Sequence, residues 1–385
     1  MKVLYLSHGD DTFGAPRSMM KMIEILKDTY GVEPIIITGR KNRINSLCDE
    51  LGIENYSIRF VNTGRYIKKK DFYFHVKGQI ARIVNVIATI KINLFLRTNV
   101  VDIIHSNVSV IDIGVRVAKK RGIPHVWHLR EILDESNNWN YYWKNNYSLM
   151  NNYTDTFIAI SNAVKKYWVS RGIKEDMIST IYNGISIDKI PVFDNKNPED
   201  IKFVLVGSIF PHKGQLDVIE AFGKLDSKIL SQIHLDIIGE GSSEYVSLIE
   251  KRIKELNLQE NISLLGFKED IVLLLGKYDV GFVASKAEAF GRTTIEYMLS
   301  GVVVIATDAG ANPELIQNGE NGFLYKSNDF QDLAYNIEYV VKKYSKLKNI
   351  KESAYYNAKQ NFSSEKNASE VYEIYKQVIQ NKLRT

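Results

Sequence analysis

The 385-residue chain has the composition of an ordinary globular protein, with 45% hydrophobic and 25% charged residues. This length is enough for two domains with a core each, and the composition excludes a disordered or collagen-like chain. The only cysteine, Cys48, allows no internal disulfide, which is typical of a reducing compartment. The N-terminus reaches polar residues after four apolar ones and no window has the length of a membrane-spanning helix, so a cytoplasmic protein is expected.

The net charge of +5 is unevenly distributed along the chain. Residues 1–195 hold 27 Lys and Arg against 19 Asp and Glu, whereas the remaining residues hold 23 against 26. We therefore expect the first half to meet an anionic partner.

Apolar runs of strand length alternate with longer segments of helical periodicity throughout the chain. In the first half these runs are 2–7, 34–39, 101–107, 124–129 and 156–161. In the second half they are 201–208, 233–241, 262–267, 279–285 and 302–308. This alternation predicts a parallel sheet with right-handed crossovers in each half.

The expected organisation is a pair of doubly wound α/β domains. We expect an N-terminal domain over 1–190, a linker over 191–200 rich in Pro, Asp and Asn, and a C-terminal domain over 201–360. A last helix over 361–385 could return to the N-terminal domain. Because doubly wound sheets bind ligands outside the carboxyl ends of their strands, a cleft between the domains is expected.

Glycine-containing turns follow four of the expected strands, at 7–19, 207–214, 239–243 and 285–294. Glycine lets the backbone approach a ligand closely, and the N-terminus of the following helix attracts phosphate. A nucleotide is the expected ligand. No turn has the complete G-x-G-x-x-G pattern, so a nicotinamide cofactor is not indicated.

The segment EAFGRTTIE at 288–296, followed by GVVVIATDAGANPELI and NGFLY, resembles the donor-site signature of family 4 glycosyltransferases. IYNGISID at 181–188, Lys213 with Gly214, and the glycines of IIGEG and LLGF extend the resemblance, which is strong from about residue 180 to 325 and looser before it. It implies the GT-B fold, in which two Rossmann-like domains face a cleft. It also implies transfer of a sugar from a nucleotide donor with retention of configuration.

The resemblance assigns roles residue by residue. Glu288 would contact the transferred sugar and Glu296 the ribose, since a carboxylate accepts hydrogen bonds from two neighbouring hydroxyls. Lys213 would hold the diphosphate, where fixed donors lower the barrier most. In isolation, either glutamate would be an ordinary helix carboxylate. The other expected donor-site residues are Gly14, Ala15, Gly207, Ser208, Gly239, Phe290, Gly291 and Arg292.

The resemblance further implies that His128, at the end of an expected strand, contacts the donor sugar and takes no part in proton transfer. The seven histidines show no metal-binding spacing, so neither a metal nor a cofactor is expected. Gly207 and Ser208 stand where the family commonly has Gly-Arg, so one phosphate-binding cation is missing. Arg292 or Arg17 could supply it.

A basic stretch over 64–98 holds eight Lys and Arg against one acid. Its plain interpretation is a helix packed on the sheet by Ile80, Ile83, Val84 and Ile87, with its charges in water. Basic residues near an anionic leaflet contribute about 1 kcal/mol each, so peripheral binding to the inner face of the cell membrane is also predicted. The residues expected at the acceptor or membrane are Arg65, Lys68, Lys69 and Lys70.

The predicted function is that of a retaining, metal-independent hexosyl- or related transferase that uses a nucleotide-sugar, with uridine diphosphate (UDP) the expected nucleotide. The expected acceptor is a polyprenyl-diphosphate-linked saccharide in cell-surface polysaccharide synthesis, with a soluble glycan or protein as the alternative and no nucleic acid partner. A sugar-nucleotide epimerase and a non-catalytic nucleotide-sugar-binding subunit are the competing interpretations. The EAFGRTTIE block favours a transferase over an epimerase, and a binding-only subunit would usually have lost Lys213 or a glutamate.

Overall fold

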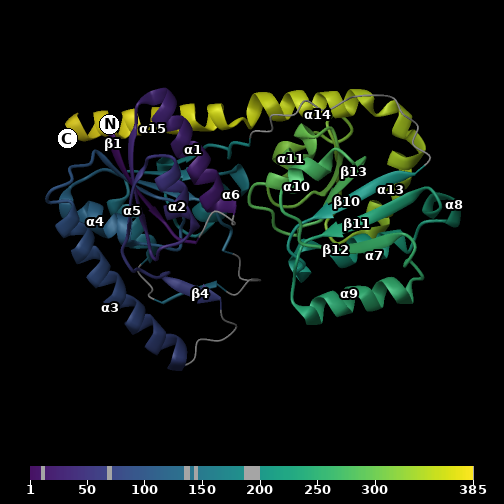
Figure 1. The fold of residues 1–385 in the computed structure, drawn as a ribbon, viewed down its shortest axis with the longest axis horizontal. Coiled ribbons are helices and arrows are strands. Elements are labelled where there is room, and N and C mark those ends of the chain that lie inside the picture. The colour runs from purple at the N-terminus through teal and green to yellow at the C-terminus, as the bar shows by residue number, and fades with distance from the viewer. Residues whose placement is uncertain (10–13, 67–71, 134–138, 143–145, 186–199, 385) are drawn as a thin grey trace. The chain divides into compact units, whose positions relative to one another are not determined.

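The computed structural model describes residues 1–9, 14–66, 72–133, 139–142, 146–185 and 200–384 (Figure 1). The chain forms two compact units, one of Met1–Gly184 with Ser364–Thr385 and one of Ile185–Ser363. The expected boundaries were at 190 and 360, and all but the last residue of the expected linker lies outside the described residues. The expected cleft between the domains stays a prediction.

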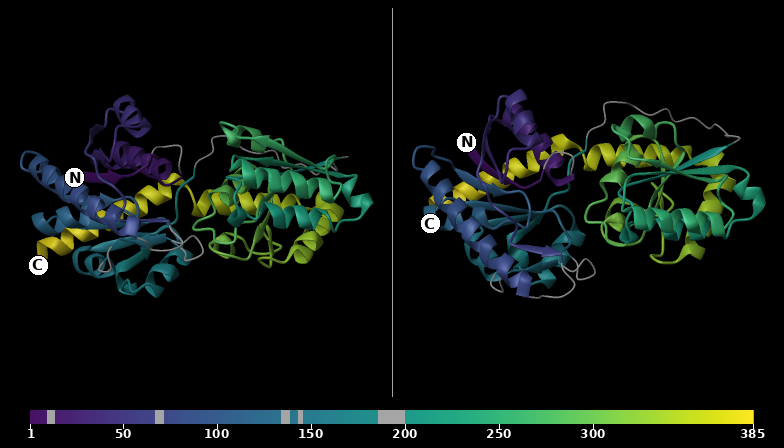
Figure 2. Two further views of the ribbon diagram at one scale, coloured as in Figure 1. Left: turned by 90° about the horizontal axis from the view of Figure 1, so that it is seen from below. Right: turned by 60° about the horizontal axis from the view of Figure 1, so that its bottom comes forward.

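The first unit, called unit 1, is built on a seven-stranded parallel sheet with the order β3-β2-β1-β5-β6-β8-β9. Its central strands are buried along their whole length because helices cover both faces of the sheet (Figure 2). Leu4 of β1 pairs with Ile35 of β2 on one side and with Ile104 of β5 on the other. The strands are β1 (Lys2–Ser7), β2 (Glu33–Thr38), β3 (Glu54–Ser57), β5 (Ile103–Ser106), β6 (His125–Leu129), β8 (Thr156–Ala159) and β9 (Ile178–Thr180).

The helices of unit 1 come from both ends of the chain. Those before residue 184 are α1 (Gly14–Tyr30), α2 (Arg43–Glu50), α3 (Phe72–Phe95), α4 (Ile113–Arg121), α5 (Asn146–Tyr153) and α6 (Asn162–Ser170), with a 3-10 turn at Glu175–Met177. The C-terminal helix α15 (Ser364–Arg384) runs beside α1 (Figures 1 and 2). Its Val371 and Tyr375 share a core with Val3 and Tyr5 of β1. A short antiparallel ribbon joins β4 (Gly64–Tyr66) to β7 (Trp139–Tyr141).

Helix α3 packs through a different face from the one expected. Ile80, Ile83 and Ile87 are 55%, 61% and 49% exposed, so the expectation that they pack on the sheet is wrong. The buried face is made of small and polar residues with one aromatic and one isoleucine, namely Phe74, Gly78, Ala81, Asn85, Ala88, Ile92 and Asn93. Gly78 fits against the ring of Tyr142, and a larger side chain there would crowd that ring. Small residues let the helix approach closely, and they leave an isoleucine-rich stripe on the outside.

The second unit, called unit 2, carries a six-stranded parallel sheet with the order β12-β11-β10-β13-β14-β15. Its strands are β10 (Ile201–Val206), β11 (Ile233–Ile238), β12 (Ile262–Gly266), β13 (Val280–Val283), β14 (Val303–Thr307) and β15 (Phe323–Tyr325). The rings of Phe203 and Phe282 stack at 5.3 Å in its core. The helices are α7 (Gln215–Phe222), α8 (Ser227–Leu230), α9 (Ser243–Glu255), α10 (Ile271–Leu275), α11 (Arg292–Leu299), α12 (Asn312–Leu315), α13 (Phe330–Lys343) and α14 (Lys348–Asn361), with 3-10 turns at Pro211–Lys213 and Tyr344–Lys346.

Each of the ten expected runs forms a strand, and the predicted pair of Rossmann-like domains is confirmed. The described residues form five strands that the sequence did not indicate: β3, β9 and β15 lie at the edges of the two large sheets, and β4 and β7 form the separate ribbon. They are three or four residues long, and β3 is mostly exposed. A strand of three or four residues is too short to show a periodic pattern in the sequence.

Candidate active site

The strand order of unit 2 reverses between β10 and β13, and the loops after these two strands meet at the carboxyl edge of the sheet. In doubly wound sheets this is the place where ligands bind. Lys213 ends the 3-10 turn after β10, and Glu288 lies in the loop after β13. Lys213 Nζ lies 3.3 Å from Glu288 Oε2, with the two side chains 28% and 19% exposed. Two residues far apart in sequence therefore form an ion pair at the expected position.

Two glycines bring the loops around this pair together. Gly214 follows Lys213 with a φ of +73°, and a side chain there would collide with the carbonyl of Ala284. Gly310, with a φ of +61°, leaves no room for a side chain beside the backbone of Glu288. The N–H of Ala311 donates to the Glu288 carbonyl at 2.8 Å. The backbone of Glu288 is thus fixed by the loop after β14, and Gly214 brings the loop after β10 against Ala284 at the end of β13.

The Glu288 carboxylate also occupies the N-terminal end of α11. Its Oε1 accepts a hydrogen bond from the Gly291 N–H at 3.3 Å, and α11 begins at the next residue. Gly291 has no side chain with which to cap the helix. The carboxylate lies between a lysine and a helix N-terminus, an arrangement that also suits a phosphate.

Glu296 lies one turn further along α11 and is only 6% exposed. Its Oε1 accepts a hydrogen bond from Arg292 Nε at 2.8 Å. The Arg292 guanidinium, a candidate for the missing phosphate-binding cation, is therefore engaged by a carboxylate of its own helix. Arg17, the other candidate, is exposed on α1 of unit 1. The role of each arginine stays a prediction.

A buried set of polar residues braces α11 against the sheet. Thr294 Oγ1 donates to Asn312 Oδ1 at 3.2 Å, and Asn312 Nδ2 donates to Thr307 Oγ1 at 3.2 Å. Thr307 Oγ1 in turn donates to the Ser285 carbonyl at 2.8 Å. Sequence reasoning missed this set, although its members stand in the quoted motifs, because that reasoning relied on charged residues and these side chains are uncharged.

The remaining expected donor residues of unit 2 lie at neighbouring strand ends. The Gly207 N–H donates to the Ile238 carbonyl at 3.0 Å, and a side chain at Gly239 would collide with the Gly207 carbonyl. The Ser208 carbonyl accepts a hydrogen bond from Gln215 Nε2 at 3.0 Å. Phe290 is buried directly before Gly291. The structure gathers these residues at one edge of the sheet, and their contacts with a donor stay predictions.

His128 ends up fully buried near the carboxyl end of β6 in unit 1. Its Nδ1 lies 3.3 Å from Arg130 Nη2, and its ring centroid lies 5.4 Å from that of His105. Burial, followed by the nearby Arg130 and His105, lowers the pKa of His128 well below its usual value, so the ring is neutral. Its Nε2 has no hydrogen-bond partner among the described residues. The expected contact with a sugar stays a prediction.

Arg130, which sequence reasoning did not single out, is buried next to His128. Its Nε donates to Asn107 Oδ1 at 2.8 Å and its Nη1 to Asn183 Oδ1 at 2.5 Å. Burial lowers its pKa to about 10. Asn107 Nδ2 donates to the Ala15 carbonyl at 3.4 Å, which connects this cluster to the first turn of α1, where Gly14 is exposed. The available signal for Arg130 was its position in the segment HLRE, just after an expected strand.

The expected acceptor or membrane residues are only partly described. Lys68, Lys69 and Lys70 lie outside the described residues. Arg65 of β4 is half-buried, with its guanidinium 5.8 Å from the ring centroid of Tyr73. Within the described ranges, no helix is both long and apolar enough to cross a bilayer, and no group of three or more His, Cys, Asp and Glu is placed to hold a metal ion.

Two family models match adjoining parts of the chain. Residues 186–357 match the model described as "Glycosyl transferases group 1", and residues 59–189 match "Glycosyltransferase Family 4". Together they cover the site in unit 2 and most of unit 1.

Individual relatives match over shorter stretches. The chain is 29% identical to N-acetyl-alpha-D-glucosaminyl L-malate synthase of Bacillus anthracis over 42% of each chain. It is 28% identical to the capsular polysaccharide biosynthesis glycosyltransferase CapM of Staphylococcus aureus, over 54% of this chain and 58% of CapM. The matched part thus spans about half the length of these relatives. The fold is similar to that of Anabaena Alr3699/HepE in complex with UDP and glucose, with a TM-score of 0.78, 22% identity and coverage of 98% and 100% of the two chains.

Proposed function

Because the chain belongs to the group 1 and family 4 type of glycosyltransferases with the GT-B fold, we propose that it transfers a sugar from a nucleotide-sugar to a saccharide acceptor. The nucleotide is proposed to be UDP, which is bound in the structure of the similarly folded HepE. CapM and other relatives are named for capsular or lipopolysaccharide biosynthesis, and this supports a role in cell-surface polysaccharide synthesis.

The observation that carries the proposal is the position of the Glu288 carboxylate. It is held at once by Lys213 Nζ and by the Gly291 N–H, each at 3.3 Å. A donor diphosphate would require the same lysine and the same helix N-terminus. When the diphosphate takes these two donors, Glu288 is released and its oxygens become free to accept hydrogen bonds from sugar hydroxyls.

The charge balance of this site suits departure of a nucleoside diphosphate. Negative charge grows on the diphosphate as the glycosidic bond breaks, and fixed donors directed at it stabilise the transition state. Lys213 and the N-terminus of α11 provide such donors without a metal. We therefore include metal independence in the proposal, and we expect activity to persist in EDTA. Retention of configuration is also part of the proposal and rests on the resemblance to family 4.

A panel of nucleotide-sugars tests the proposed donor. Titration calorimetry with UDP-, GDP- and dTDP-sugars is expected to show binding of one UDP-sugar, which Lys213→Ala weakens. Lys342→Ala is the matched control, because it also removes a lysine–glutamate ion pair, at 2.6 Å on α13. If wild-type protein binds no nucleotide-sugar, or if both substitutions have equal effects, the proposed function fails.

The outer face of α3 supports a further part of the proposal, peripheral binding to an anionic membrane. Six of its aliphatic residues are between 48% and 61% exposed, and Lys77, Arg82 and Lys91 lie on the same helix. The exposed aliphatic residues are Ile80, Ile83, Val86, Ile87, Ile90 and Leu94. A helix that lies in the membrane interface combines such an apolar stripe with basic residues.

Co-sedimentation with vesicles tests the membrane proposal. Wild-type protein is expected to bind vesicles of anionic lipid more strongly than neutral ones, and less at high salt. The double variant Ile83→Ser with Ile87→Ser should reduce binding, whereas Leu248→Ser, a 48% exposed leucine on α9 of unit 2, should not. Charge reversal of Lys68, Lys69 and Lys70 to Glu is expected to weaken binding as well. Equal sedimentation with neutral and anionic vesicles would contradict the proposal.

A further inference from the structure

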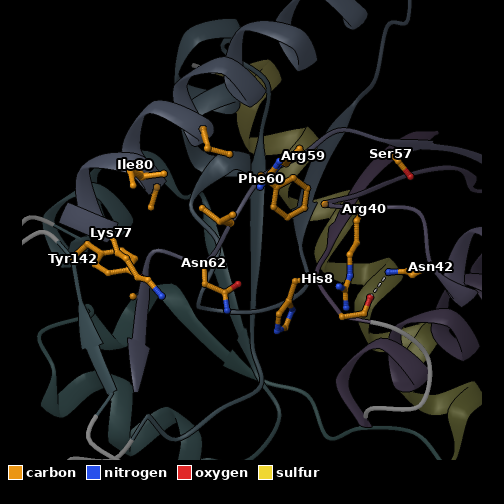
Figure 3. Close-up of a pocket in the computed structure, with 16 residues that line it drawn as sticks. His8, Arg40, Asn42, Ser57, Arg59, Phe60, Asn62, Lys77, Ile80 and Tyr142 are labelled. Carbon is orange, nitrogen blue, oxygen red and sulfur yellow. Dashed lines mark hydrogen bonds between the residues drawn. The ribbon is translucent and has the colours of Figure 1, made fainter. Parts of the chain in front are cut away.

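A pocket of about 1040 Å³ lies within unit 1, at the carboxyl end of its sheet (Figure 3). The loops after β1, β2 and β3 form one part of its wall, and α3 forms another. Figure 3 shows Lys77 and Ile80 at one side, and Arg40 at the other side near the loop after β1. Phe60 and Arg59 come from the loop after β3.

The charged residues that line this pocket, among those that the structure describes, all have the same sign. Arg40 and Arg59 are exposed, and neither has an ion pair or side-chain hydrogen bond with any described residue. Lys77 is half-buried, and its Nζ lies 4.5 Å from the ring centroid of Tyr73. The described lining residues include no aspartate or glutamate. Three cations without a carboxylate raise the local potential and attract an anion.

The pocket lining also contains a buried polar atom without a hydrogen-bond partner among the described residues. Nδ1 of His8, which also lines the pocket, has no hydrogen-bond partner among the described residues. Burial lowers the pKa of His8, so the imidazole is neutral and can donate or accept a hydrogen bond. A buried polar group without a partner usually indicates that a ligand or water completes it.

The opposite part of the lining is apolar and continues onto the protein surface. Phe60 is buried, while Ile80 and Val84 project from α3. Ile80 is 55% exposed and begins the stripe that continues with Ile83 and Ile87. The pocket therefore joins cations to an apolar path along the outside of α3.

Specific contacts hold the walls of the pocket in place. Asn85 of α3 accepts from the Val61 N–H and donates to the Val61 carbonyl, both at 3.0 Å, which fixes the loop after β3. Asn42 Nδ2 donates to the Gly9 carbonyl at 2.6 Å, which fixes the end of the loop after β1. These hydrogen bonds fix the positions of the two loops and of α3 around the pocket.

We propose that this pocket binds the phosphate-bearing head of a lipid-linked acceptor. Its phosphate or diphosphate oxygens contact Arg40, Arg59 and Lys77, and the first apolar units of the lipid lie along Phe60, Ile80 and Val84. An uncharged glycan would leave the three cations unpaired, and inorganic phosphate would leave the apolar lining unused. The proposal rests on the proposed function, since the molecule bound here is the acceptor of the transfer.

Calorimetry on the full chain with farnesyl diphosphate as the probe tests the site. Farnesyl diphosphate is expected to bind at least about tenfold more tightly than either farnesol or inorganic diphosphate, since it alone uses both parts of the lining. Arg40→Gln with Arg59→Gln should weaken its binding by about tenfold or more. Ile80→Ser should weaken the binding of farnesyl diphosphate and leave the binding of inorganic diphosphate unchanged.

Matched controls separate this site from the membrane surface and from the donor site. Arg82→Gln with Lys91→Gln, which removes two exposed cations of α3 outside the pocket, should leave farnesyl diphosphate binding unchanged. UDP binding should persist in the Arg40 and Arg59 variant, so a failure here is distinguishable from failure of the proposed function. The inference is overturned if farnesol binds as tightly as its diphosphate, if the control loses as much affinity as the pocket variant, or if UDP binding is lost together with that of farnesyl diphosphate.

Discussion

Lys213 and Glu288 pair with each other, and breaking this pair is a cost of donor binding. A partly exposed ion pair contributes about 0.2–1 kcal/mol. Glu288→Gln removes the competing charge, so we expect UDP to bind up to about fivefold more tightly while sugar transfer slows. Titration with UDP checks this, with Glu338→Gln on the surface of α13 as control. Weaker UDP binding by the Glu288 variant would contradict the proposal that the diphosphate replaces the Glu288 carboxylate at Lys213.

The resemblance to family 4 singled out Lys213 and Glu288, and their places at strand ends of a doubly wound sheet explain why they meet. Sequence spacing could not predict the hydrogen bonds from Thr294 through Asn312 to Thr307, which depend on how α11 packs against β14. Sequence spacing also could not predict that the ring of His128 is buried. The ring is buried because both faces of the sheet are covered at β6, and this depends on how the helices pack.

The buried histidines predict a pH dependence of stability in unit 1. Burial lowers the pKa of His125 from 6.5 to about 3. Below pH 6.5 the unfolded chain binds a proton that the folded chain excludes, so the free energy of unfolding should fall by up to about 1.4 kcal/mol per pH unit down to about pH 3. Tryptophan fluorescence reports on unit 1, because all four tryptophans lie there. His125→Gln should lower this slope by up to that amount, whereas the contributions of the buried His105 and His128, whose pKa values are also lowered, should remain. An unchanged slope would contradict this account.

At the scale of elements, α3 shows where pattern reasoning fails. Its isoleucines were expected to face the sheet, yet the buried face is built from Gly78, Ala81, Asn85 and Ala88 with a few larger residues. Apolar periodicity indicates the buried face only when water is the sole alternative environment. Under the proposed membrane binding, the apolar stripe of α3 meets a lipid surface, and the same periodicity then indicates the wrong face.

The attachment of α3 to the loop after β3 gives a prediction for stability. Asn85 is 2% exposed and pairs with both backbone groups of Val61. Asn85→Ala leaves these groups without partners, so unit 1 should lose about 1–3 kcal/mol of unfolding free energy. Urea denaturation followed by tryptophan fluorescence measures the loss, with the exposed Gln79→Ala on the same helix as control. Equal stability of the two variants would show that the contact is unimportant.

At the scale of the whole molecule, the last helix belongs to the first unit. Ala368, Val371, Tyr375 and Val378 of α15 are buried in the core that contains β1 and α1. Deletion of residues 364–385 should therefore remove the cooperative unfolding transition seen by tryptophan fluorescence. Deletion of only 380–385, beyond the last buried residue, should preserve it. Retention of a normal transition without α15 would mean that unit 1 folds without this helix.

The turnover of the Lys213→Ala variant tests the central claim most directly. The claim is that Lys213 and the N-terminus of α11 stabilise the departing nucleoside diphosphate. Loss of one preorganised donor costs about 2.7–4 kcal/mol in the transition state. With saturating donor and a membrane fraction as acceptor, UDP release by the variant should therefore be slower by a factor of about 10²–10³, while Lys342→Ala retains the wild-type rate. A Lys213→Ala protein that releases UDP at the wild-type rate would contradict the account.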